Sequence, residues 1–168
     1  MKALKKVQTI LDKASTFVAS ILCAAMMLIL IANVILRFVP GVGGFKWYME
    51  GGQFLNVFSM MIAGIGITAR RTHLHVELVE SLAAKNPVMK KVHMVIVSVF
   101  EILFYAMVTY GGYLAATYPA AVRRTVSTMP QFTMGQVYMI FPIAGALTVV
   151  AAVVDLLVNL FDQEGGNK

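Results

Sequence analysis

The sequence predicts an all-α integral membrane protein with four transmembrane helices. Of its 168 residues, 59% are hydrophobic and only 13% are charged, which is too little charge for the surface of a soluble domain. Four runs with little or no charge are long enough to cross a hydrocarbon core of about 30 Å as helices. None alternates with period two, and an open sheet cannot lie in lipid. The length leaves room for a single membrane domain, residues 1–168.

The first two spans are predicted at residues 14–36 and 51–69. Neither run contains a charged residue. The basic start of the chain resembles a signal peptide, but the first run is too long for a signal and no small-residue cleavage site follows it. We therefore expect a retained anchor. The single cysteine, Cys23, lies inside this run, which excludes an intramolecular disulfide.

The third and fourth spans are predicted at residues 92–118 and 135–160. The fourth contains Pro142, which is expected to kink it. Small residues recur at a spacing of four, which predicts close approach between helices. These sets are Ser59/Ala63, Gly64/Thr68, Gly111/Ala115 and Ala144/Thr148/Ala152.

The distribution of lysine and arginine predicts the orientation. Ten of these residues lie before the first span, between the second and third, or after the fourth, and four lie in the two other loops. Cytoplasmic loops carry the excess of positive charge. Both termini and the middle loop are therefore predicted to be cytoplasmic. The net charge of +6 comes from residues at the edges of apolar runs, which favours membrane phospholipids over nucleic acid as the partner.

The segment from about 72 to 86 is predicted to be an amphipathic helix in the headgroup plane between the second and third spans. Its apolar residues fill one half of a helical wheel and its acids the other. His73, His75 and Glu77 could also be metal ligands. Residues two apart point in different directions on a helix, however, so we favour interfacial side chains. A haem site would need histidine pairs that face one another within the spans, and none of the three histidines lies in the middle of a span, so we do not expect haem.

Glu101 is the one acid well inside a predicted span. An ionisable group at this depth is a functional candidate by default. It shares a helix face with Ser98, Tyr105, Thr109 and Gly112. We favour a buried polar contact with another helix; the alternative is a self-sufficient proton-coupled exporter, active as a homodimer around Glu101. The sequence contains no plausible catalytic triad or phosphate-binding loop, so we expect no enzyme.

Three stretches resemble the small membrane subunit of TRAP (tripartite ATP-independent periplasmic) transporters, the DctQ-like or Q subunit. The stretches, in order, are "VILRFVPGVGGFKWYME", "GIGITARRTHLHVELV" and "VYMIFPIAG". The positions that match the family pattern are Arg37, Phe38, Trp47, Glu50, Gly64, Arg70, His73, Val76, Glu77, Leu78, Tyr138 and Pro142. Met49 stands where the family often has a second acid, Glu77 replaces the more usual aspartate, and the glycine after the proline is displaced to Gly145.

The resemblance implies a scaffold in the bacterial inner membrane. In this family a periplasmic binding protein (DctP-like) delivers an organic acid, such as a C4-dicarboxylate or a sialic acid. A large subunit (DctM-like) carries the substrate and sodium sites, so we expect no cofactor in this chain. The motif residues are expected to meet partner subunits or lipid, and Arg70 and Arg71 to bind lipid phosphate where the second span ends.

Overall fold

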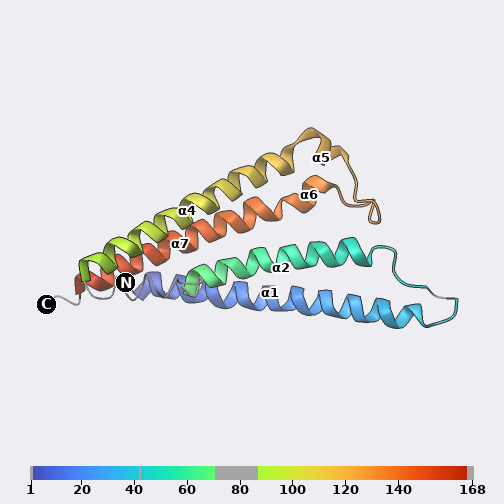
Figure 1. Cartoon of the computed structure of the whole chain (residues 1–168), viewed down its shortest axis with the longest axis horizontal. Helices are drawn as coiled ribbons and strands as arrows, with labels where there is room; N and C mark the ends of the chain where they lie inside the picture. Colours follow the sequence, from blue (N-terminus) through green and yellow to red (C-terminus); the bar gives the residue numbers. More distant parts are fainter. Residues whose placement is uncertain (1, 42, 71–86, 166–168) are drawn as a thin grey trace.

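The computed structural model describes residues 2–41, 43–70 and 87–165. Within them the helices follow the order α1 (Lys2–Arg37), α2 (Tyr48–Arg70), α4 (Pro87–Thr117), α5 (Pro119–Arg123), α6 (Met134–Tyr138) and α7 (Ile140–Gly165). The chain forms two antiparallel hairpins, α1 with α2 and α4 with α7 (Figure 1). Both termini lie at one end of the bundle, here called the terminal end. The opposite end, here called the loop end, carries the connections 38–47 and 118–133.

Four stretches of the described residues are long and apolar enough to cross a membrane. They are Leu4–Arg37, Tyr48–Arg70, Val95–Thr117 and Met134–Val158. This result confirms the all-α prediction of four spanning helices, and each stretch overlaps one predicted span. The predicted interfacial segment at 72–86 lies outside the described residues.

The first helix is longer than predicted, because it begins at Lys2 rather than near Ala14. Nothing in the intervening sequence breaks a helix: lysine, leucine, glutamine and alanine are all good helix formers. Only the part of the helix inside the lipid must be apolar, so the apolar run ends before the helix does. The extra turns also have partners, because Gln8 and Asp12 bond to α2 and α7.

The fourth predicted span is divided into α6 and α7 at Met139. Pro142 has no backbone N–H, so it cannot bond to the carbonyl of Tyr138 four residues earlier. The amide of Met139 instead bonds to the carbonyl of Gln136, at 3.3 Å, and the next turn resumes with Ile143 donating to Met139. The expected kink is therefore a break of one residue.

The α4–α7 hairpin depends on glycines that allow close approach. A Cβ on Gly112 would lie 2.5 Å from Cβ of Phe141, and one on Gly145 would lie 2.5 Å from Oγ1 of Thr109. Within this chain the contact uses Gly112 and Ala116, which are buried, whereas Gly111 and Ala115 are exposed, so their predicted close approach to a helix is not made here. Spacing alone identified the motif but not which of two adjacent faces packs.

The two hairpins join where α2 packs against α7. Ile65 and Ala69 of α2 form a buried cluster with Ala144 and Ala151 of α7. The predicted strip of small residues on α7 is buried as well, since Thr148 is 1% and Ala152 2% exposed. Toward the loop end the hairpins diverge (Figure 1).

We expect Gly112→Ala to destabilise the protein and Gly111→Ala to leave it nearly unchanged. The new methyl group at position 112 would collide with the backbone nitrogen and ring of Pro142, whereas position 111 has no such neighbour within 4 Å. Overpacking of this kind costs about 1–3 kcal/mol. Thermal unfolding of the two purified variants in the same detergent measures the difference, and equal midpoints would contradict the packing described here.

Candidate functional site

Polar side chains connect three helices at the terminal end. Nε of Arg70 pairs with Oδ1 of Asp12, which joins the end of α2 to α1. A terminal nitrogen of the same guanidinium donates to Oγ1 of Thr16 at 2.9 Å. Gln8 of α1 donates to Oδ1 of Asp155 on α7 at 3.1 Å. Arg70, a residue of the family motif, thus also fixes the α1–α2 hairpin.

Glu101 contacts the other hairpin. Its Oε1 accepts a hydrogen bond of 2.8 Å from Oγ1 of Thr68, so the bond joins α4 to α2 inside the bundle. Gly64, one turn earlier on α2, faces Tyr105, since a Cβ there would lie 3.7 Å from the phenol oxygen. The strip of α4 that carries Glu101 therefore faces protein here.

Motif residues of the first loop meet at the loop end. Arg37, the last residue of α1, donates to the phenol oxygen of Tyr48 at 2.9 Å, and its guanidinium carbon lies 5.2 Å from the centroid of that ring. Trp47 stacks on Phe45, with ring centroids 5.3 Å apart. Its indole also covers Gly51, where a Cβ would lie 2.9 Å from Cε3. These contacts fix the end of α1 against the start of α2.

Glu50 joins the two hairpins at the loop end. Its Oε2 accepts hydrogen bonds from the backbone N–H of Thr128 at 2.9 Å and from the Thr128 hydroxyl at 2.6 Å. Thr128 belongs to the 124–133 loop, which is closed by backbone bonds from Val126 to Phe132 and from Met134 to Arg124. The motif acid therefore holds the second loop over the start of α2.

An apolar cavity of about 530 Å³ lies beneath this contact. Phe54 and Phe58 of α2 line one side, and Val137 of α6 lines the other. Met129 and Phe132 of the 124–133 loop also line it. The cavity occupies the place where the hairpins diverge.

Tyr138 and Pro142 mark the break between α6 and α7. Tyr138 is the last residue of α6, and its ring centroid lies 6.5 Å from that of Phe141. Pro142 lies against Gly112, whose added Cβ would come 3.0 Å from Cδ of the proline. Arg71, His73 and Glu77 lie outside the described residues, as does the metal alternative for the histidines.

Asn33 is a structural residue that the sequence reasoning missed. Its side chain is 2% exposed, and its Oδ1 accepts a bond of 2.8 Å from the backbone N–H of Phe45. A Cβ on Gly44 would lie 2.4 Å from that oxygen, so only glycine allows the loop to pass so closely. A lone asparagine inside an apolar run was the available signal.

These side chains mainly hold helices together. Each acid whose side chain the structure describes accepts a hydrogen bond from another segment: Asp12 from Arg70, Glu50 from Thr128, Glu101 from Thr68 and Asp155 from Gln8. Among the described residues, no group of three histidine, cysteine, aspartate or glutamate side chains is arranged to hold a metal ion. The chemistry of this part of the chain is that of interhelical contacts.

Removal of the Glu50 carboxylate is expected to release the 124–133 loop. Glu50→Ala loses both bonds to Thr128, whereas Thr128→Val retains the backbone bond and should have a smaller effect. Trp47 is the only tryptophan and lines the cavity beneath the loop, so acrylamide quenching of its fluorescence reports the change. Thr117→Val, which removes a hydroxyl bonded only within its own helix, is the control. Equal quenching in all four proteins would contradict this role of Glu50.

Comparison with known families identifies the family of the chain. Residues 26–162 match the family described as "Tripartite ATP-independent periplasmic transporters, DctQ component". No curated protein and no solved structure gives a significant match. The matched region covers more than three quarters of the 168 residues and includes all three motif stretches, which confirms the resemblance seen in the sequence. This multi-pass membrane protein belongs to the DctQ family, the small membrane component of TRAP transporters.

Proposed function

We propose that this chain is the scaffold subunit of a sodium-coupled TRAP importer of an organic acid, and that it stabilises the large transport subunit in the membrane. The observation that carries the proposal is that the described acidic side chains hold segments of this chain together. Asp12, Glu50, Glu101 and Asp155 each accept a hydrogen bond from another segment of the chain. Carboxylates engaged in this way fix the relative positions of helices.

The proposal assigns the substrate and sodium sites to the large subunit. That division follows the family organisation, in which the DctQ component works with a large membrane component and a periplasmic binding protein. The substrate class that we propose is a carboxylate, with C4-dicarboxylates and sialic acids as the first compounds to test. This chain would bind phospholipid and protein partners and would need no cofactor.

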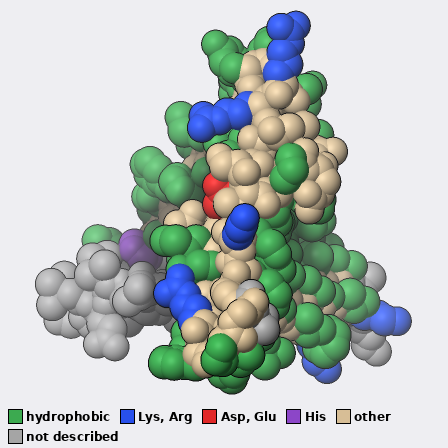
Figure 2. Space-filling view, turned by 90° about the vertical axis from the view of Figure 1, so that its right-hand side faces the viewer, with side chains coloured by type: hydrophobic (Ala, Val, Ile, Leu, Met, Phe, Trp, Pro, Cys, Tyr) green, Lys and Arg blue, Asp and Glu red, His purple; other side chains and the backbone are tan. Residues whose placement is uncertain are grey.

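The proposed orientation places the terminal end in the cytoplasm of a bacterial cell and the loop end in the periplasm. The support is the excess of lysine and arginine in the sequence before the first span, between the second and third spans, and after the fourth. The loop end carries the exposed basic side chains of Arg37, Lys46, Arg123 and Arg124. Figure 2 views this end and shows basic side chains spread over it, with one small acidic spot among them. Such a surface suits phospholipid phosphates and a soluble periplasmic partner.

Co-purification tests the scaffold role. The chain is expressed together with a DctM-like large membrane protein, which we expect to be encoded beside it, and only this chain carries a tag. We expect both proteins to elute as one stoichiometric complex in mild detergent. Elution of this chain alone, as a homodimer, would refute the proposal and favour an exporter built around Glu101.

Substitution of Glu101 separates a packing role from a proton-relay role. Glu101→Gln keeps an oxygen that can accept the hydrogen bond from Thr68, so the complex should remain intact and import substrate at nearly the wild-type rate. Glu101→Leu removes the acceptor and should lower the yield of the complex. Uptake into proteoliposomes measures the first expectation, and loss of transport in an intact Glu101→Gln complex would show that the proton of this carboxyl group is needed.

A further inference from the structure

The outward surface of α2 differs in chemistry from those of α4 and α7, because it carries the amides of Gln53 and Asn56 within its spanning segment. The exposed residues of α2 lie on one strip, because they follow one another at intervals of three or four residues. The one interval of seven, from Met60 to Ile67, contains Ala63, which is of intermediate exposure. We call this the α2 strip; its members are Met49, Gln53, Asn56, Met60, Ala63, Ile67 and Arg70. By contrast, the outward surface of α4 carries large apolar side chains, such as Phe100, Leu103 and Phe104.

Two amides of the α2 strip lie in the spanning segment without a partner in the described part of the chain. Asn56 is eight residues from the start of α2, which places it about 12 Å along a helix that crosses a core of about 30 Å. Gln53 lies one turn closer to the loop end. An amide that faces hydrocarbon loses the hydrogen bonds that water would give it. A surface with these groups is therefore suited to a protein partner that can bond to them.

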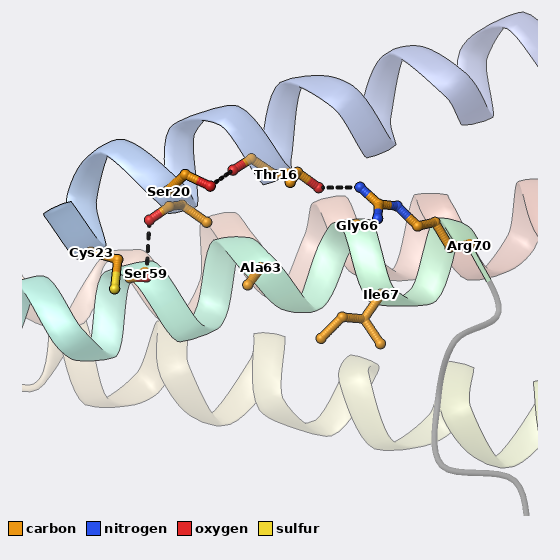
Figure 3. Close-up of a pocket in the computed structure, with 9 residues that line it drawn as sticks. Thr16, Ser20, Cys23, Ser59, Ala63, Gly66, Ile67 and Arg70 are labelled. Carbon is orange, nitrogen blue, oxygen red and sulfur yellow. Dashed lines mark hydrogen bonds between the residues drawn. The ribbon is translucent and has the colours of Figure 1, made fainter.

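A groove of about 330 Å³ between α1 and α2 adjoins the α2 strip. Ala19, Ser20 and Cys23 of α1 line it together with Ser59 and Ala63 of α2 (Figure 3). The hydroxyls of its floor are already engaged, since Ser59 donates to the carbonyl of Ala19 at 3.1 Å and Ser20 donates to the carbonyl of Thr16 at 2.8 Å. Small side chains with satisfied hydroxyls allow another helix backbone to come close.

We propose that the α2 strip and this groove receive a transmembrane helix of the large membrane subunit, an inference that rests on the proposed function. The 23 residues of α2 present the strip over about 33 Å, which matches a whole spanning helix. The amides of Gln53 and Asn56 need hydrogen-bonding partners inside the membrane. A protein helix can provide such partners, whereas acyl chains cannot.

Photo-crosslinking tests which face meets the partner. A photoreactive amino acid replaces Met60 in one variant and Met107 in another; these methionines are 66% and 74% exposed, on the α2 strip and on α4 respectively. Each tagged variant is co-expressed with the large subunit and irradiated in membranes. We expect a crosslink to the large subunit from position 60 and none from position 107.

The other outcomes separate the two proposals. If the complex forms but crosslinks from 107 and not from 60, or from neither, the face is wrong and the scaffold function stands. A crosslink from 60 to a second copy of this chain would also overturn the assignment. If no large subunit co-elutes with the unmodified chain, both proposals fail.

Asn56→Leu gives a second readout that does not depend on crosslinking chemistry. Loss of one interhelical hydrogen bond should weaken association with the large subunit about three- to tenfold, whereas Asn56→Gln should retain most of it. Met107→Leu is the control for added leucine on a lipid-facing surface. A face that met only lipid would tolerate Asn56→Leu, so unchanged association in a detergent titration would refute the proposal.

Discussion

Interhelical hydrogen bonds to carboxylates are the interaction on which the arrangement of this bundle depends. In lipid, burial of apolar side chains gives little drive for helices to associate, because acyl chains are as apolar as leucine. Close packing and polar bonds must provide the specificity. Here Asp12 joins α1 to α2, Glu101 joins α4 to α2, and Asp155 joins α7 to α1. Glu50 adds the connection between α2 and the second loop. Every major helix is therefore held by at least one carboxylate.

Those contacts explain why the small residues take the positions they do. The α2–α7 seam is built from Ala69, Ala144 and Ala151 beside Ile65, and such short side chains let the backbones approach until the polar groups can meet. Toward the loop end the helices diverge and leave the apolar cavity between α2 and α6. Glu50 and Thr128 bridge that gap. The bundle is thus packed tightly at one end and tied by a loop at the other, in keeping with the scaffold role proposed for it.

Hydropathy predicted the four spans because solubility in lipid depends on composition, which can be counted residue by residue. The additional turns of α1 and the break at Met139 could not be predicted in this way. The additional turns of α1 depend on the contact of Gln8 with Asp155, 147 positions away. The break at Met139 depends on which backbone hydrogen bonds form near Pro142. The motif residues could be identified from sequence, but their partners could not. Glu50 bonds to Thr128, and nothing local to either residue indicates that pairing. The contact of Asn33 could not be predicted either, because its partner is the backbone amide of Phe45 and a backbone amide has no sequence signature.

The length of α1 has a consequence for the surrounding bilayer. Its 36 residues extend about 54 Å, against a hydrocarbon core of about 30 Å. In an upright helix, Lys2 would lie about 17 Å farther from the membrane centre than Lys13, while a headgroup layer is only about 5–8 Å thick. In that orientation the first turns of α1 would extend through the headgroup layer, and Gln8 and Asp12 fix them there to α7 and α2. The rigid part of the bundle would thus reach past the lipid into the aqueous phase on this side.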